Sequence, residues 1–217
     1  MNERKGYDRI VFVYDFIAGF FSFNQINKSQ LGFLLHLSDQ SSCLILGGGT
    51  GYFLQKLLEM NKTIHVTYID ASANMIAAAQ QRIQKKIPDA LDRVAFFCKE
   101  VENFEWQKYD VIVSNYFLDL FGEDHVQVLV KKFNKYLNPQ GFVYITDFHI
   151  PETNSFVKWG TILGLKILYR VHKSITKMEV RKLPKIEKIM MMQNFSILYS
   201  ENYLKGILKC NLYKKNH

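Results

Sequence analysis

Residues 43–51 read Cys-Leu-Ile-Leu-Gly-Gly-Gly-Thr-Gly, an apolar run that passes directly into a glycine-rich loop. The apolar residues are typical of a strand that is buried on both faces of a sheet. From Thr50 to Met60 the apolar residues recur with helical spacing, so a helix is predicted after the loop. A doubly wound α/β fold binds its ligand at a loop of this kind, between a strand and the next helix.

The alternation of strands and helices continues along the chain. Apolar runs predict further strands at residues 64–69, 94–98, 110–113 and 142–146, and helical spacing predicts helices at 72–87 and 123–137. Ser72 is a suitable N-cap for the first of these helices. Residues 138–141, Asn-Pro-Gln-Gly, predict a turn before the last of these strands. This order indicates a parallel sheet that is covered by helices on both sides.

Both ends of the chain depart from this alternation. Helices predicted at 7–23 and 25–37 would form an N-terminal helical cap. Near the C-terminus, a helix is predicted around 185–193, followed by strands at 195–203 and 207–213 in an antiparallel hairpin. The predicted fold is therefore α/β, a doubly wound, Rossmann-like and mostly parallel seven-stranded sheet with a C-terminal antiparallel hairpin.

Length and composition favour a single domain. The chain has 217 residues, of which 48% are hydrophobic and 14% aromatic, and this composition excludes disorder as the main state. Within one domain at 1–217, we expect a helical cap (1–40), a cofactor-binding core (41–150), and basic helices with the closing hairpin (151–217). The three cysteines show no Cys-x-x-Cys spacing, so no metal site is predicted and a cytoplasmic location is expected.

Charge is distributed unevenly along the chain, whose net charge is +8. Residues 1–150 carry 15 basic and 16 acidic side chains, whereas residues 151–217 carry 13 and 4. Such asymmetry is typical of a surface for anionic lipid, nucleic acid or an acidic substrate, and equally of a lysine-rich face exposed to water.

The spacing of the glycines indicates which kind of ligand the loop can bind. A dinucleotide-binding loop has the pattern G-x-G-x-x-G, but Tyr52 stands at its third glycine position when the count begins at Gly47. Asp70 follows at the end of the second predicted strand, where an acidic side chain can accept hydrogen bonds from a ribose. A phosphate-binding P-loop is excluded because no Gly-Lys-Ser/Thr follows the glycines.

On these residues the sequence resembles the class I S-adenosylmethionine (SAM) dependent methyltransferases, in the small-molecule branch that includes the ubiquinone and menaquinone biosynthesis enzymes. Residues 44–51 are similar to the first motif of that family, and residues 70–75, Asp-Ala-Ser-Ala-Asn-Met, to its second. The resemblance covers residues 7–146 well and residues 183–213 more weakly. The chain departs from the family at Ile45, where an acidic residue is usual.

The resemblance implies SAM as the methyl donor and S-adenosylhomocysteine (SAH) as the product. Asp70 would hold the ribose, Met75 would pack near the adenine, and Glu100 or the Val101 amide would contact the adenine edge. Tyr14 would belong to a lid over the cofactor. The implied cofactor-binding residues are Tyr14, Gly47, Gly48, Gly49, Gly51, Asp70, Ala71, Met75, Glu100, Val101 and Asn115.

The implied reaction is an in-line displacement that moves the methyl group to a small-molecule acceptor, and it depends mainly on positioning and exclusion of water. A general base is needed only where the nucleophile carries a proton. The candidates at the ends of the fourth and fifth strands are Asp119, Asp147 and His149, of which His149 and Asp119 are the predicted catalytic residues. Aromatic rings that would suit the cation are those of Tyr14, Tyr116, Phe117 and Phe121.

Two other functions stay open at this point. The basic charge of residues 151–217 is the reason to consider a nucleic-acid methyltransferase. Residues 114–117 argue against this function, because they lack the paired prolines of amino-methylating nucleic-acid enzymes. Because Ile45 stands where an acidic residue is usual, a non-catalytic SAM-binding protein is the other alternative. The predicted partner is a small-molecule acceptor, anionic or lipophilic, with peripheral membrane contact through the basic segment 158–181. The chain is expected to be a monomer or a homodimer.

Overall fold

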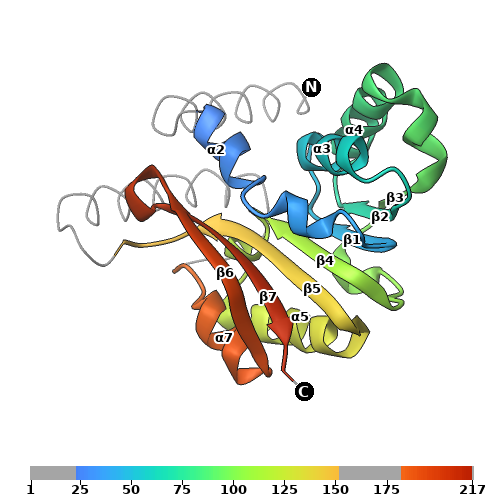
Figure 1. Ribbon diagram of the computed structural model, residues 1–217. Coiled ribbons are helices and arrows are strands. Elements are labelled where there is room, and N and C mark those ends of the chain that lie inside the picture. Colours follow the sequence, from blue (N-terminus) through green and yellow to red (C-terminus); the bar gives the residue numbers. More distant parts are fainter. Residues whose placement is uncertain (1–22, 152–181, 217) are drawn as a thin grey trace, which may run out of the picture.

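The computed structural model of the chain describes residues 23–151 and 182–216 (Figure 1). The strands are β1 (Ser42–Leu46), β2 (His65–Asp70), β3 (Val94–Cys98), β4 (Tyr109–Asn115), β5 (Leu137–Phe148), β6 (Phe195–Tyr203) and β7 (Leu208–Lys215). The α-helices are α2 (Phe23–Ser29), α3 (Tyr52–Met60), α4 (Ala73–Lys86), α5 (Glu123–Tyr136) and α7 (Ile186–Met192). Short 3-10 helices are η1 (Leu34–Leu37), η2 (Pro88–Arg93), η3 (Val101–Asn103), η4 (Leu118–Leu120) and η5 (Leu204–Gly206).

All of the described strands belong to one seven-stranded sheet, in the order β3-β2-β1-β4-β5-β7-β6. The strands β1 to β5 are parallel to one another, and β7 is antiparallel to both β5 and β6. After β3 the chain crosses back to the other side of β1, so the strand order reverses between β1 and β4. Open α/β sheets bind their ligands at such a switch point. The predicted fold class is confirmed.

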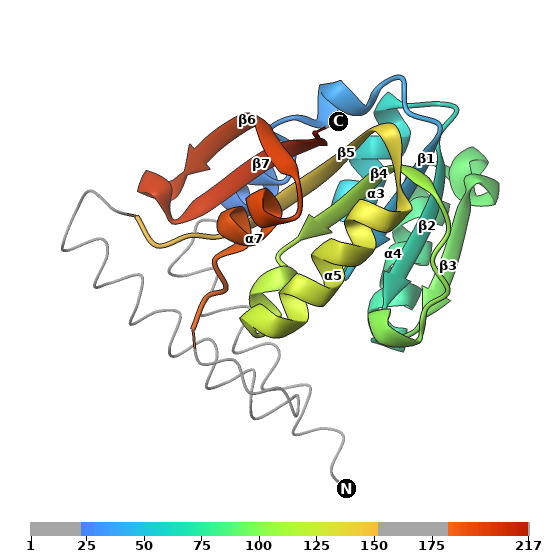
Figure 2. The same cartoon turned by 90° about the horizontal axis from the view of Figure 1, so that it is seen from below.

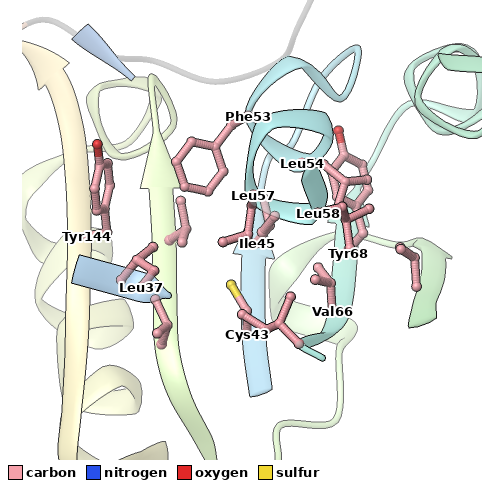
Figure 3. Packing of buried hydrophobic residues seen from close by; sticks show 14 of the residues in the cluster. Leu37, Cys43, Ile45, Phe53, Leu54, Leu57, Leu58, Val66, Tyr68 and Tyr144 are labelled. Carbon is pink, nitrogen blue, oxygen red and sulfur yellow. The ribbon is translucent and has the colours of Figure 1, made fainter. Parts of the chain in front are cut away.

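Helices cover both faces of the sheet, α3 and α4 on one side and α5 and α7 on the other (Figure 2). The side chains of β1 alternate between the two apolar cores that result. Cys43 and Ile45 pack with α3, as Figure 3 shows, and with α4, whereas Leu44 and Leu46 pack with α5 and α7. This burial on both faces explains why β1 is a continuous apolar run and does not alternate with polar residues.

The helix predicted at 25–37 is wrong in its extent, because α2 ends at Ser29 and the chain continues to the separate η1. The Tyr144 hydroxyl on β5 explains the break. It donates to the Gln30 carbonyl (2.8 Å) and accepts from the Phe33 N–H (3.2 Å). Backbone groups that would continue the helix are therefore held by the sheet. The helix predicted at 7–23 lies outside the described residues except for Phe23, the first residue of α2, and the basic segment 158–181 lies outside them entirely.

Residues 138–141, for which the sequence predicts a turn, lie within the bounds of the long strand β5 but have no partner in its register with β4. Leu137 pairs with Tyr109 and Phe142 with Val111, so four residues of β5 are inserted opposite the single residue Asp110 of β4. The Asp110 carboxylate accepts from the Asn138 side-chain amide at 2.7 Å and so holds this part of β5 against β4. The predicted C-terminal hairpin is confirmed, with a second register shift on β6 between Ile197 and Tyr199.

The described residues contain no helix that is long and apolar enough to cross a membrane.

Two substitutions on α5 test how this helix is oriented. Phe133 is 0% exposed and Val128 is 54% exposed. Phe133→Ala is expected to lower the free energy of unfolding by about 3–5 kcal/mol, whereas Val128→Ala should change it by less than about 0.5 kcal/mol. Thermal unfolding of the full chain, followed by circular dichroism, measures the difference. Similar losses in the two variants would contradict the packing of α5.

Candidate functional site

The glycine loop follows β1 and needs glycine for its backbone conformation. Gly47, Gly49 and Gly51 have φ of +57°, +63° and +79°, in the left-handed region that glycine adopts most easily. The Gly48 N–H donates to the Ile69 carbonyl at the end of β2 (3.2 Å). The loop is thereby held across the carboxyl ends of β1 and β2.

Neighbouring side chains also require glycine at Gly47, Gly48 and Gly51, whereas Gly49 faces open space. A Cβ at Gly47 would lie 2.2 Å from the Phe117 ring, and a Cβ at Gly48 would lie 2.1 Å from the Tyr68 ring. At Gly49, no atom of the described residues lies within 4 Å of the added Cβ. Gly49 therefore forms a surface that a ligand can approach closely.

Asp70 connects this loop to helix α4. Its Oδ2 accepts from the Gly49 N–H and its Oδ1 from the Ser72 N–H, both at 2.9 Å. Ser72 then caps α4, because its Oγ accepts from the Met75 N–H at 3.4 Å, which confirms the predicted N-cap. A carboxylate oxygen has two lone pairs, so both oxygens of Asp70 keep capacity for a further donor.

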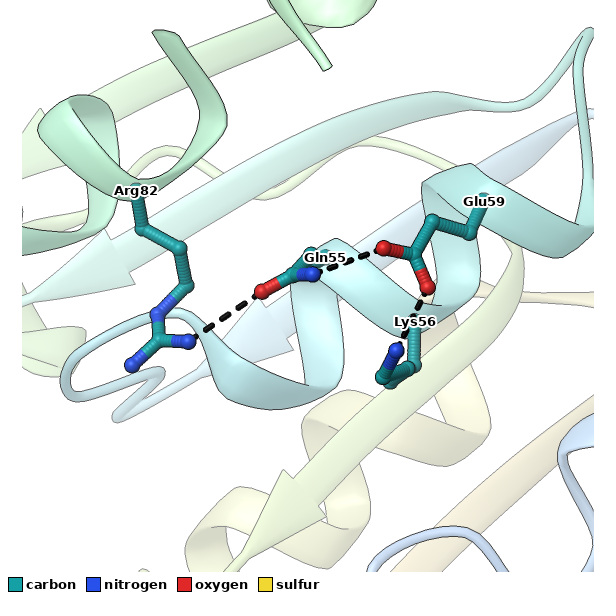
Figure 4. A network of polar contacts seen from close by, with 4 residues as sticks. All are labelled: Gln55, Lys56, Glu59 and Arg82. Carbon is teal, nitrogen blue, oxygen red and sulfur yellow. Dashed lines mark hydrogen bonds and ion pairs between the residues drawn. The ribbon is translucent and has the colours of Figure 1, made fainter. Parts of the chain in front are cut away.

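A network of polar side chains on α3 and α4 is bonded to the glycine loop at Thr50, and Figure 4 shows its members. Arg82 on α4 donates from Nε to the Thr50 carbonyl (2.8 Å) and from Nη1 to Gln55 Oε1 (3.1 Å). Gln55 donates to Glu59 Oε1 at 2.6 Å, and Glu59 also pairs with Lys56 at 2.7 Å. Sequence reasoning missed Arg82, since a single arginine on a helix carries no motif and its partner is a backbone carbonyl.

The residues implied for the adenine lie at the carboxyl ends of β2 and β3. Asp70 pairs with Cys98 in the sheet, and the Lys99 N–H donates to the Asp70 carbonyl at 3.1 Å. The remaining implied residues around this point are Ala71 (exposed), Met75 (half-buried), Glu100 (exposed) and Val101 (buried). Their contact with an adenine stays a prediction, and Tyr14 lies outside the described residues.

The end of β4 lies level with the glycine loop, because Ser114 pairs with Leu46. Within the described ranges, no group hydrogen bonds either polar atom of the buried Asn115 amide. Tyr116 follows in a left-handed conformation (φ +53°), with its hydroxyl 2.5 Å from Ser29 Oγ. Burial raises the pKa of this hydroxyl well above its ordinary value.

Two carboxyl groups meet beyond Asn115. Asp119 in η4 and Asp147 on β5 are only 2% and 4% exposed, and the Asp119 N–H donates to Asp147 Oδ2 at 3.2 Å. Burial raises the pKa of both groups, and Asp119 raises that of Asp147 further through its charge and a side-chain hydrogen bond. No group of the described residues hydrogen bonds Asp119 Oδ1.

His149 is held at a different place. Its Nδ1 lies 3.2 Å from the Gly206 carbonyl, and its N–H donates to the Ile207 carbonyl at 2.7 Å, both in the connection between β6 and β7. The structure thus brings Asp119 together with Asp147, while His149 contacts the hairpin. The catalytic role predicted for His149 and Asp119 stays a prediction.

Known proteins are similar to this chain in sequence. Residues 44–143 match the model of a family described as a methyltransferase domain. Malonyl-[acyl-carrier protein] O-methyltransferase of Bacillus cytotoxicus is 34% identical over 106 residues, which is 48% of this chain and 34% of that protein. The chain therefore spans about a third of the length of this curated relative.

Solved structures share the fold at low identity. An O-methyltransferase family protein from Burkholderia thailandensis superposes with a TM-score of 0.70 and 16% identity, over 96% of this chain and 59% of that one. CalO1, a methyltransferase in calicheamicin biosynthesis solved in its SAH-bound form, gives 0.62 and 15%, over 87% and 54%. Residues 44–143 thus match a methyltransferase domain, and the described fold is shared with solved methyltransferase structures.

Proposed function

We propose that this chain transfers a methyl group from SAM to a small-molecule acceptor. The observation that carries the proposal is the open face of Gly49 beside the Asp70 carboxylate, at the point where the strand order reverses. The SAH in the CalO1 structure and the domain family matched by residues 44–143 support the same cofactor. Tyr52 at the third glycine position argues against a dinucleotide.

The described residues fit SAM at three places. Gly49 leaves room for close approach to the loop backbone, and Asp70 keeps lone pairs for the ribose hydroxyls. The third place is the Asn115 side chain, whose buried polar atoms have no partner within the described ranges and suit the polar methionine end. Ala71, Met75, Glu100 and Val101 would surround the adenine.

Ile45 takes no part in this binding. It is 3% exposed and packs in the apolar core with α3 and α4. The methionyl amine would therefore be bound by Asn115 and the carbonyl groups of the loop. This arrangement replaces the acidic contact that the family resemblance implies two residues before the first glycine.

SAM supplies a methyl group that is activated by the positive sulfur. The contribution of the chain is to position the reactants and exclude water. The Phe117 ring packs against the loop at Gly47. The centroid of the Phe121 ring lies 4.9 Å from that of the Phe117 ring, in an edge-to-face arrangement. Aromatic rings next to the loop offer apolar walls for an acceptor and faces that stabilise a cation.

The small-molecule class of the acceptor and a cytoplasmic location belong to the same proposal. Cys43 and Cys210 are buried free thiols, and Cys98 is an exposed one. An exposed free thiol suits a reducing compartment. Turnover of SAM with an acceptor separates this function from that of a non-catalytic SAM-binding protein.

Calorimetry with SAM, SAH and NAD tests the cofactor. We expect SAM and SAH to bind and NAD not to bind. Asp70→Ala should weaken SAM binding roughly ten- to hundredfold, because a hydrogen bond to a charged group contributes ~1.5–3 kcal/mol. Asp89→Ala, which removes an exposed carboxylate from η2, is the matched control. NAD binding without SAM binding, or an unchanged affinity in folded Asp70→Ala, would contradict the assignment.

Substitutions at two neighbouring glycines test ligand binding and folding separately. Gly49→Ala places a methyl group in the open space above the loop, at a strain of about 1–2 kcal/mol for its positive φ. We expect it to reduce SAM affinity at least tenfold while the chain stays folded. Gly48→Ala directs its methyl group into the Tyr68 ring and should mainly lower the melting temperature. Calorimetry and thermal unfolding of both variants measure this difference. An unchanged SAM affinity in Gly49→Ala would contradict the proposed position of the cofactor.

A further inference from the structure

Asp119 and Asp147 come from separate segments and bury their carboxyl groups together. Both are almost inaccessible to water, and one hydrogen bond of 3.2 Å connects the Asp119 N–H with Asp147 Oδ2. Lys209 pairs with Asp147 in the strand register, but its Nζ binds Glu187 Oε1 at 2.5 Å. Within the described residues, no basic group forms an ion pair with either carboxyl group.

Two buried carboxylates without a cation cannot both be charged at low cost, so such a pair retains one proton. The burial of both groups agrees with this protonation, because it raises both pKa values above the ordinary value. The pair then has a single negative charge.

The pair lies at the same edge of the sheet as the glycine loop. Asn115 pairs with Thr146, and β4 lies next to β1 in the sheet, so Asp147 follows directly at this edge. Asp119 Oδ1 is buried and has no partner within the described ranges. A buried carboxylate oxygen without a donor is costly, and this cost points to a ligand that supplies one.

We propose that Asp119 and Asp147 form a proton-sharing pair that faces the acceptor and selects an uncharged hydroxyl compound, with Asp119 as the general base. This inference rests on the proposed methyl transfer and specifies its acceptor. The acceptor hydroxyl donates to Asp119 Oδ1. As the oxygen forms its bond to the methyl carbon, its proton passes to Asp119, and the carbon–sulfur bond breaks with its electron pair remaining on sulfur.

Other acceptor groups fit this pair poorly. A carboxylate would bring a second negative charge into a buried site and would be repelled. An ammonium group would be bound well, but the negative charge would hold its proton and leave no lone pair for attack. Of the anionic and lipophilic acceptors that the sequence suggests, the pair therefore favours the uncharged lipophilic one.

Among the described residues, few other titratable groups lie near the pair. The Tyr116 hydroxyl is affected by the charges of both aspartates, but it is hydrogen bonded to Ser29 and its pKa is raised further. Glu187 and Lys209 neutralise each other on α7 and β7. His149, two residues after Asp147, contacts the Gly206 carbonyl.

The buried pair should make stability depend on pH. Both folded-state pKa values are raised, so above the ordinary value of about 4 the folded chain binds more protons than the unfolded chain. This contribution is full at low pH and is lost as pH rises through the folded pKa values. Asp147→Asn should therefore flatten the fall in melting temperature as pH rises above about 4, whereas Asp124→Asn, an exposed control on α5, should leave it unchanged.

Infrared difference spectroscopy of the full chain tests the shared proton directly. Wild type at neutral pH should show the carbonyl band of a protonated carboxyl group, and Asp147→Asn should remove it. A spectrum without this band would overturn the pair, whatever the outcome for SAM. Failure of SAM to bind in calorimetry would instead refute the methyl transfer.

Matched acceptors test the selectivity. Phenols, with the anilines and benzoates of the same ring substitution, are incubated with the full chain and SAM, and SAH release is measured. We expect turnover of phenols, and a loss of 10²- to 10⁴-fold in Asp119→Asn with SAM affinity retained. In Asp147→Asn, whose amide can still donate to Asp119, turnover should fall less than tenfold. Turnover of benzoates or anilines at the phenol rate, or of no phenol at all, overturns the proposal.

Discussion

The Asp70 carboxylate connects three parts of the molecule, and the geometry of the site depends on this connection. One oxygen holds the Gly49 N–H of the loop after β1, and the other holds the Ser72 N–H at the start of α4. The backbone of Asp70 also accepts from Lys99 at the end of β3. A single acidic residue at the end of β2 thus fixes the loop, a helix N-terminus and the next strand connection relative to one another.

The loop itself could be predicted from the sequence because it depends on local rules. Four consecutive apolar residues indicate a strand covered on both faces, and the glycines indicate backbone conformations that other residues avoid. The structure confirms both at β1 and at Gly47, Gly49 and Gly51. The N-cap at Ser72 belongs to the same class, since its partner is only three residues away.

Contacts between distant segments could not be predicted in this way. The Tyr144 hydroxyl ends the helical path near Gln30, 114 residues earlier in the chain. The pairing of Asp119 with Asp147 depends on how η4 folds back against the end of β5, and no sequence pattern records that approach. Arg82 is a similar case, because its partner at Thr50 is a carbonyl that every residue has. The sequence indicates Asp119 and Asp147 only as alternative candidates after neighbouring strands, whereas in the structure they lie together.

Both edges of the sheet are poor templates for an additional strand. β3, at one edge, is only five residues long. β6, at the other, changes register between Ile197 and Tyr199, and such a bulge interrupts the row of backbone groups that a new strand would pair with. The Tyr199 ring packs 4.4 Å from the His36 ring beside this interruption. Extension of the sheet from one copy of the chain into another is therefore disfavoured, so copies that associate would have to meet through side-chain surfaces.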